Sequence, residues 1–397
     1  MPSLDDSARS SAAPVPAAGL GEVARQWTRI GAIGFGGPPA HISLLRELCV
    51  ERRRWLDEEQ FEDAIAATNL LPGPASTQLA IFCAWRVGGV PGALVGGAGF
   101  ILPGLVLIIA LGVLFLSGAP PVWVLGVGAG AGAAVAAVAV RAGTSLMPAS
   151  WRRATGGQRA RWVVYVLLGG LAAAAVGPWL VLVLLAAGVV ELAWRHGLGS
   201  SIGALHAWPL AAVASIAATG GLGALAWTAF KVGALSYGGG FVIIPLMQAD
   251  AVEVNRWLTD GEFLNAVALG QVTPGPVVHT VAVVGYAAAG IGGAVLAAAV
   301  AFLPSFSFIL LGAERFDRLA ASARVRAFLD GAGPAAIGAI AGSAVPLALA
   351  LSQRWQVAVL IAAAIALLIL RRGVVATLLS AGAIGAAVAL AGAPLPG

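Results

Sequence analysis

The chain has 397 residues, of which 59% are hydrophobic and only 10% are charged, and its mean hydropathy is +0.91. A soluble domain carries about 25% charged residues, so this composition excludes one and indicates a membrane protein. The formal net charge is +5, but the basic residues lie in short clusters between apolar runs, as in cytoplasmic loops, and not on a soluble module that could bind nucleic acid.

The first 20 residues are rich in serine, alanine and proline and contain no long apolar run. This composition predicts a disordered N-terminal tail (1–20) rather than a signal peptide. Residues 21–195 are predicted to form a first repeat, which starts with a short amphipathic helix over 21–33. Two breaks follow, one rich in glycine at 34–39 and one that reads Pro-Gly-Pro at 72–74.

Four apolar runs complete the first repeat, and each is near the roughly 20 residues that cross a bilayer. They cover about 92–116, 121–140, 162–176 and 179–194. The basic stretch between the second and third runs, which begins at Arg141, is predicted to be a loop.

Residues 196–222 are predicted to be a linker that carries one extra transmembrane segment, over 208–222. Residues 223–397 are predicted to form a second repeat. The whole chain is therefore predicted to be an all-α polytopic membrane protein with about 10–13 hydrophobic segments, some of them broken or re-entrant at the Pro-Gly-Pro motifs.

An internal duplication relates the two halves at an offset of 202 residues. It places Arg29 on Lys231, Gly36 and Gly37 on Gly238 and Gly239, and Pro72-Gly73-Pro74 on Pro274-Gly275-Pro276 without a gap. A gapless register over this distance does not arise by chance, so the two halves are predicted to be homologous.

Loop charges predict that the second repeat is inverted relative to the first. The connection after Leu116 is uncharged, whereas the one after Leu311 is rich in arginine: Arg315, Arg318, Arg324 and Arg326. Basic loops stay on the cytoplasmic side, so the two connections are expected on opposite sides of the membrane. The extra segment at 208–222 supplies the odd crossing that inversion requires.

The Pro-Gly-Pro breaks predict an anion-binding device. Pro72 and Pro74 remove backbone donors, so no continuous helix passes through this point. Gly73 is a suitable N-cap and Pro74 a favoured first helical residue, which leaves the next three amides without intrahelical acceptors. Such a helix start suits an anion, and paired broken helices in two halves of a membrane protein point to a transport site.

Two cations occupy the same repeat position just before the glycine breaks, Arg29 and Lys231. A cation near bilayer depth faces a cavity or a partner, so both are predicted to contact the anion; the alternative is that both extend to the membrane interface. The glycines that follow are predicted either to bring backbone close to the anion or to allow tight helix packing: Gly36, Gly37, Gly238 and Gly239.

Polar side chains flank both Pro-Gly-Pro breaks. They are predicted to line the anion pathway or to satisfy freed backbone groups: Asn69, Ser76 and Thr77 around Gly73, and Gln271, His279 and Thr280 around Gly275. A histidine side chain ordinarily titrates near neutral pH, so both a proton-coupling role and a packing role are left open for His279. The sequence contains no catalytic, metal-ligand or nucleotide-binding motif, so neither an enzyme nor a bound cofactor is expected.

The paired motifs are Gly34-Phe35-Gly36-Gly37-Pro38 with Leu71-Pro72-Gly73-Pro74, repeated as Ser236-Tyr237-Gly238-Gly239-Gly240 with Thr273-Pro274-Gly275-Pro276. They resemble the motifs of the chromate ion transporter family, in its long two-domain form. The resemblance covers residue 27 to the C-terminus and implies a bacterial inner-membrane protein, with homologous halves in opposite orientation, that exports chromate and confers resistance. It also implies sulfate as a competing ion, since both are tetrahedral dianions. Gly240 of the second repeat stands at the position of Pro38 in the first, so the two repeats need not contribute equivalently to the anion site.

The prediction is therefore a secondary transporter that exports chromate, with the anion held between the repeats by helix N-termini and by Arg29 and Lys231. A carrier of sulfate or another dianion, uptake included, is the first alternative, and a membrane scaffold or enzyme is the second. The expected partners are chromate or sulfate and the lipid bilayer, without nucleic acid. The oligomeric state is left open, a homodimer included.

Overall fold

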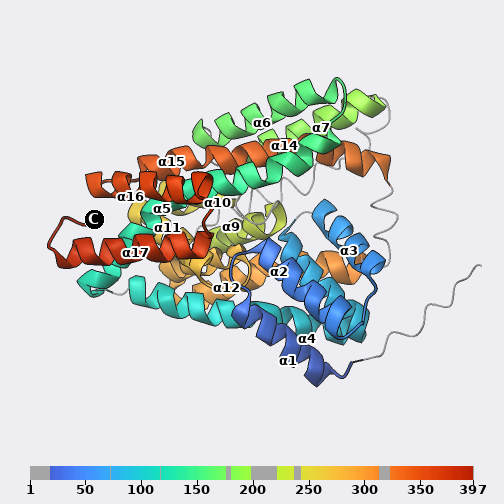
Figure 1. Ribbon diagram of the computed structural model, residues 1–397, viewed down its shortest axis with the longest axis horizontal. Helices are drawn as coiled ribbons and strands as arrows, with labels where there is room; N and C mark the ends of the chain where they lie inside the picture. The colour runs from blue at the N-terminus through green and yellow to red at the C-terminus, as the bar shows by residue number, and fades with distance from the viewer. Residues whose placement is uncertain are drawn as a thin grey trace, which may run out of the picture.

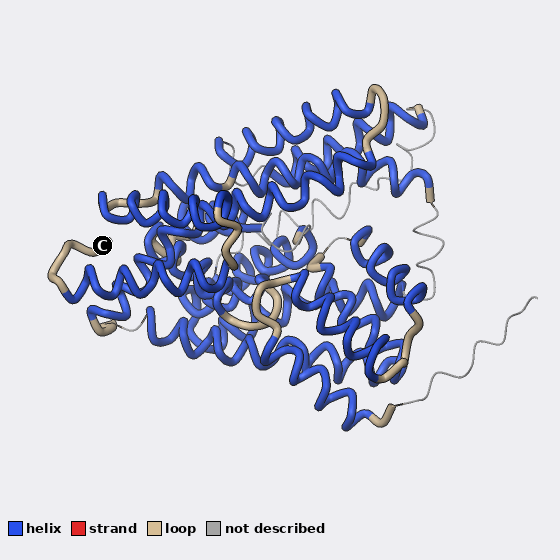
Figure 2. The backbone as a smooth tube through the Cα atoms, viewed as in Figure 1, coloured by secondary structure: helices blue, strands red, loops and turns tan. Residues whose placement is uncertain are grey.

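The computed structural model describes residues 18–71, 73–116, 118–175, 180–197, 221–236, 243–312 and 322–396. Within these ranges the chain consists of helices and short connections, without a strand (Figure 2). The all-α prediction is therefore confirmed. Several predicted features lie outside the described residues: nearly all of the N-terminal tail, Pro72, nearly all of the extra segment at 208–222, the pair Gly238 and Gly239, and the arginines Arg315 and Arg318.

The helices of the first half are α1 (Leu20–Ile33), α2 (Pro38–Arg46), η1 (Glu47–Arg52), α3 (Glu58–Leu70), α4 (Ala75–Phe115), α5 (Val122–Arg153), α6 (Gln158–Ala175) and α7 (Leu180–His196). Those of the second half are α9 (Gly221–Leu235), α10 (Ile243–Gln248), η5 (Ala249–Val254), α11 (Asp260–Val272), η6 (Val277–His279), α12 (Thr280–Gly312), α14 (Ala323–Gly342), α15 (Ala344–Leu349), α16 (Arg354–Ala364), η8 (Ile365–Ile369) and α17 (Val374–Leu390). Among the described residues, four segments are long and apolar enough to cross a membrane: α4, α5, η6 with α12, and α14 with α15.

The backbone repeats itself in detail at the offset found in the sequence. The π-helical turns η1 and η5 occupy the same repeat position, and each is followed by an arginine with left-handed backbone, Arg54 (φ 52°) or Arg256 (φ 53°). The next helices, α3 and α11, both begin with a capping box, which starts at Asp57 in one and at Thr259 in the other. The homology of the two halves therefore extends to individual turns.

The segments α4 and α12 are each folded into a hairpin of two antiparallel arms. The turns lie at Gly89 in α4 and at Gly290 in α12, with φ of 61° and 63°, a conformation that side chains disfavour. After the turn, Gly92 comes so close to Ala84 that a β-carbon would lie 2.5 Å from the Ala84 carbonyl oxygen. The apolar run predicted from residue 92 is thus the second arm of α4, and residues 75–87 form a short first arm.

Contacts between the two hairpins determine the relative direction of the repeats. Gly104 and Gly112, in the second arm of α4, lie against His279 and Val283, which open the first arm of the α12 hairpin. The second arm of α4 is therefore parallel to the first arm of α12 and antiparallel to the second arm of α12. Corresponding arms of the two repeats are antiparallel, as the predicted inverted repeat requires.

The two halves interlock because each packs a long helix against the other (Figure 1). In the first half, α5 packs along α16 and α17 of the second half, while α14 of the second half packs against both α6 and α7. Glycines let these helices touch through their backbones, since a β-carbon on Gly126 of α5 would lie 2.5 Å from the carbonyl oxygen of Gly385 in α17. Small residues at helix contacts are typical of transmembrane bundles.

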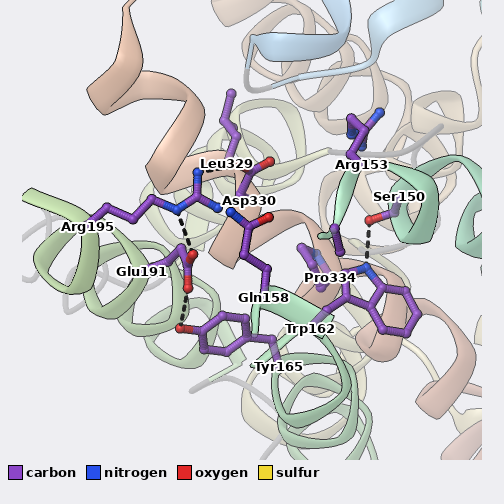
Figure 3. A pocket seen from close by; sticks show the side chains of 11 residues that line it. Ser150, Arg153, Gln158, Trp162, Tyr165, Glu191, Arg195, Leu329, Asp330 and Pro334 are labelled. Carbon is purple, nitrogen blue, oxygen red and sulfur yellow. Dashed lines mark hydrogen bonds and ion pairs between the residues drawn. The ribbon is translucent and has the colours of Figure 1, made fainter. Parts of the chain in front are cut away.

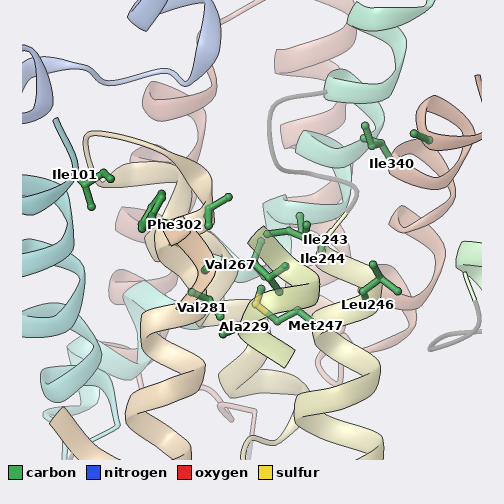
Figure 4. Close-up of a cluster of buried hydrophobic side chains, with 14 of the residues drawn as sticks. Ile101, Ala229, Ile243, Ile244, Leu246, Met247, Val267, Val281, Phe302 and Ile340 are labelled. Atoms are coloured by element: carbon green, nitrogen blue, oxygen red, sulfur yellow. The ribbon is translucent and has the colours of Figure 1, made fainter. Parts of the chain in front are cut away.

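Apolar side chains from both halves fill the interior (Figure 4). Ile101 of α4, Phe302 of α12 and Met247 of α10 belong to one buried cluster. The second Pro-Gly-Pro break lies within this interior, since every residue from 273 to 280 is buried. The break is therefore held by packing on all sides and is not a surface loop.

Candidate functional site

The glycine break of one repeat meets the Pro-Gly-Pro break of the other. The Gly275 amide donates a hydrogen bond of 3.0 Å to the carbonyl of Gly34. On the other side, a β-carbon on Gly73 would lie 3.5 Å from the carbonyl oxygen of Gly233 in α9, which corresponds to Gly31 at the offset of 202 residues. Gly73 and Gly275 have φ of 121° and 93°, in the region that favours glycine. The breaks of the two repeats therefore converge.

The helices restart at the second proline of each break, and not at the glycine. Pro74 is the N-cap of α4 and Pro276 is that of η6, so the N-cap role predicted for Gly73 is wrong. The reason is that Pro74 has the extended backbone of a cap residue, whereas Gly73 is in the positive-φ region. The third and fourth amides of α4 bond to the Pro74 carbonyl, which leaves those of Ala75 and Ser76 open.

A cavity of about 380 Å³ lies at this convergence. Its volume is within the range of small-ligand sites, about 300–1,000 Å³. Four helices begin at its wall: α2 at Pro38, α4 at Ala75, η6 at Val277 and α17 at Val374. The other lining residues are Gly36, Gly37, Pro39, Ile42, Val138, Arg141, Ala142, Ser145, Leu146 and Gln271. Helix starts carry partial positive charge, so their convergence favours an anion.

Two polar side chains at this wall, those of Gln271 and Arg141, have donors without a partner among the described residues. Gln271, at the end of α11, is 7% exposed, and its Nε2 has no hydrogen-bond partner among the described residues. Arg141 forms no ion pair within the described part of the chain, and no lining residue is acidic. The structure thus brings together Gly36, Gly37 and Gln271 of the predicted site around a cavity that is rich in donors.

Arg141 was not among the predicted site residues, and its prediction as a loop residue is wrong. It lies within α5, whose 32 residues span about 48 Å and exceed the hydrocarbon thickness of about 30 Å. Val138, Arg141, Ala142 and Ser145 are spaced three or four residues apart and form one face of α5 at the cavity. A long helix of small residues therefore carries this arginine to the site.

Neither predicted cation, Arg29 or Lys231, lines the cavity. Arg29 is exposed on α1 and has no ion pair among the described residues. Lys231 on α9 pairs with Asp250, whose Oδ2 also accepts a 2.9 Å hydrogen bond from the Thr228 hydroxyl. Asp250 is 6% exposed and was missed, although an acid in an apolar run was a visible signal. Contact of either cation with an anion stays a prediction.

His41, which was not among the predicted site residues, connects α2 with the glycine break and with the start of α4. Its Nε2 lies 2.9 Å from the carbonyl oxygen of Gly34, and its Nδ1 lies 3.1 Å from the hydroxyl of Ser76. Because a carbonyl only accepts, Nε2 carries the proton and Nδ1 accepts from Ser76 in the neutral ring. His41 of α2 therefore holds the glycine break against the start of α4.

The remaining predicted residues are buried or lie outside the description. The Thr77 hydroxyl and both ring nitrogens of His279 have no hydrogen bond of normal geometry within the described residues, although two backbone carbonyls lie near the His279 ring. Thr280 donates to a carbonyl of η6 at 2.8 Å and so closes that turn. The side chain of Asn69 is outside the described part.

A second polar cluster lies between α6, α7 and α14 (Figure 3). Glu191 accepts hydrogen bonds from Arg161 and Arg195 at 2.7–2.9 Å and from Tyr165 at 3.1 Å. Arg195 also pairs with Asp330 at 2.9 Å and so links the two halves. The space here is about 20 Å³, room for about one water molecule. Arg153 also lines this space, whereas Glu191 and Asp330 are held in ion pairs with Arg161 and Arg195, so we interpret these pairs as structural contacts between α6, α7 and α14.

Known proteins resemble this chain over nearly its whole length. A family model described as chromate transporter matches residues 21–192 and 223–387, one region in each half. A chromate transport protein of Cupriavidus metallidurans is 32% identical over 358 residues, which cover 87% of this chain and 86% of that protein. A chromate transport protein of Pseudomonas aeruginosa is 30% identical over 373 residues, with coverage of 89% and 86%. No solved structure matches.

Proposed function

Because this chain belongs to the chromate transporter family, we propose that it is a secondary transporter that exports chromate across the bacterial inner membrane. The observation that carries the proposal is the cavity where the breaks of both repeats converge. Four helix starts, the Gln271 amide and Arg141 lie at its wall, and its described lining contains no acid. A tetrahedral oxyanion supplies the acceptors and the negative charge that this wall lacks.

The backbone contributes directional donors to the anion. The open amides of Ala75 and Ser76 in α4, and the first amide of η6 at Val277, donate to its oxygens. Gly36 and Gly37 have no side chain to separate the backbone from the ion. Binding through several amides suits an anion that must also leave, because no single bond holds it.

The inverted repeat provides the means of transport. When two inverted halves exchange conformations, a site at their junction faces first one side of the membrane and then the other. The hydrogen bond from Gly275 to Gly34 joins the halves beside the cavity, so a relative movement of the halves changes the cavity directly. Net export results if the protein binds chromate while the cavity faces the cytoplasm and then, driven by the voltage or ion gradients across the membrane, changes to the state in which the cavity faces outward.

The test is chromate transport by the purified protein in liposomes, with a voltage and a pH gradient imposed separately. We expect radiolabelled chromate to cross only liposomes that contain the protein, and one of the two gradients to drive its accumulation. Unlabelled sulfate is the competitor that addresses the sulfate alternative. Transport of sulfate without any transport of chromate would contradict the proposed substrate, and exclusively inward coupling in oriented vesicles would contradict the direction.

A further inference from the structure

We infer that Arg141 is the cation that makes this cavity prefer dianions over monoanions. The inference rests on the proposed function, because it takes the cavity as the anion site. Arg141 is the one charged side chain among the described lining residues. The other positive contributions come from helix starts and from a neutral amide, which attract anions of any valence.

The position of Arg141 is fixed by a long, closely packed helix. Residues 126–139 of α5 are all buried except Val127, which is partly buried, and α5 packs along both α17 and α14. About two turns of α5 carry Val138, Arg141, Ala142 and Ser145 to the cavity wall, which Ala75 and Gln271 also line. The arginine therefore enters the site from a rigid element, while the backbone donors come from the breaks.

Its charge is not compensated in the described structure. Lys231 is paired with Asp250, and Arg161 and Arg195 share Glu191. Arg141 has no carboxylate partner in the described ranges, although it is only partly exposed. A cation inside a membrane protein faces a partner or a cavity, and here the cavity is the feature that it faces.

The Coulomb energy between Arg141 and an anion is proportional to the charge of the anion. Removal of the arginine charge therefore costs a dianion about twice the free energy that it costs a monoanion at the same distance. The guanidinium also offers parallel donors to two oxygens of one oxyanion, which the ammonium of lysine does not. Charge and geometry both favour a tetrahedral dianion.

The experiment measures equilibrium binding of radiolabelled chromate to the purified full-length protein, with sulfate and nitrate as competitors. We expect Arg141→Gln to raise the chromate Kd about 10- to 100-fold, as for the loss of a charge-assisted hydrogen bond. The inhibition constant should rise similarly for sulfate and only about 3- to 10-fold for nitrate, which is the square-root relation expected for half the charge. The preference for dianions over monoanions thus falls.

Two variants and one separate assay keep the result interpretable. Arg141→Lys should restore most of the dianion preference but not the full affinity, because the charge remains and the paired donors are lost. Arg152→Gln is the matched control, since it removes an exposed arginine from α5 three turns further along on a similar face. This control variant should leave the chromate Kd and the inhibition constants of sulfate and nitrate unchanged.

Unchanged dianion preference in Arg141→Gln, or an equal loss for sulfate and nitrate, would overturn the inference. So would a wild-type protein that binds none of the three anions. Because binding is measured apart from transport, a wild-type protein that binds chromate with the expected Arg141 dependence but does not move it would refute the proposed transport and leave the inference standing.

Discussion

At the scale of single residues, the glycines of the two Pro-Gly-Pro breaks are constrained both by their neighbours and by their backbone conformation. A β-carbon on Gly275 would lie 2.8 Å from the ring of His279, and one on Gly73 would lie 2.5 Å from Nε2 of Gln78. Both glycines also have positive φ, which costs about 1–3 kcal/mol for a residue with a side chain. We expect Gly73→Ala and Gly275→Ala each to lower the initial rate of chromate transport at least about tenfold.

Gly118→Ala is the control for these variants, because no atom lies within 4 Å of its added β-carbon. All three proteins should insert into the membrane and elute as a single species in detergent. Transport at the wild-type rate in both break variants would mean that the glycines serve only the packing of the bundle.

The pair of Lys231 and Asp250 is expected to behave as a buried ion pair. Removal of one partner leaves the other charge buried without compensation, which costs about 3–5 kcal/mol. We therefore expect Lys231→Gln to lower the thermal unfolding temperature in detergent markedly, and Lys231→Gln with Asp250→Asn to recover much of the loss. An unfolding temperature that stays unchanged in Lys231→Gln would show that the lysine is not held by Asp250 and would favour its predicted contact with the anion.

The comparison of the two halves gives weight to residues that repeat, and the outcome is mixed. Gly36, Gly37 and Gln271, which repeat or flank a repeated motif, line the cavity, whereas the repeated cations Arg29 and Lys231 do not. At the offset of 202 residues, His41 corresponds to Ile243 and Asp250 to Leu48, so a comparison of the two halves does not identify either polar residue as a candidate. Asymmetric residues of this kind can be recognised only when the fold brings them next to the breaks.

At the scale of helices, the existence of the apolar segments was predictable but their folding was not. The two arms of α4 are joined without a polar loop, and the non-helical backbone of Gly88 and Gly89 separates them. The end of α5 was placed too early because a charge after an apolar run is typical of a loop. Arg141 breaks this rule because it lines a cavity, where a charge in a long helix is tolerated.

Packing between α5 and α17 depends on close backbone contact. A β-carbon on Gly385 would overlap the carbonyl oxygen of Gly126 and lie 2.8 Å from the Cα of Gly130. Overpacking of this kind costs about 1–3 kcal/mol, so we expect Gly385→Ala to lower the thermal unfolding temperature in detergent. Gly373→Ala, at the N-cap of the same helix and without a neighbour within 4 Å, should leave it unchanged. Equal stability of the two variants would contradict the close contact.

At the scale of the whole molecule, the inverted repeat was predicted from loop charges together with one extra crossing, whereas the interlocking of the halves was not predictable. Hydropathy and charge report how each segment crosses the membrane, but they carry no information on which segments pack together. The exchange of α5 and α14 between the halves depends on complementary surfaces of glycine and alanine. Several described helices are rich in glycine and alanine, α4, α5, α12, α14 and α17 among them, so the sequence does not indicate which of them pack together.

Inversion also makes a prediction about the two membrane faces. Single cysteines at Ala119, after α4, and at Ser322, before α14, should react with a membrane-impermeant thiol reagent from opposite sides. The background replaces Cys49 and Cys83, which are both buried. Labelling of both positions from the same side in intact cells would contradict the inverted repeat.

The proposed function requires that the transported anion occupies the cavity where the breaks of the two repeats converge. Ser145 lines this cavity and is exposed, so a cysteine there in the cysteine-free background should react with an anionic thiol reagent. We predict that chromate slows this reaction, with half-maximal protection at the concentration that half-saturates transport, and that it leaves the reaction of a cysteine at Ala119 unchanged. If the Ser145→Cys variant still transports chromate but its labelling rate does not depend on chromate, the anion does not bind in this cavity and the proposed site is wrong.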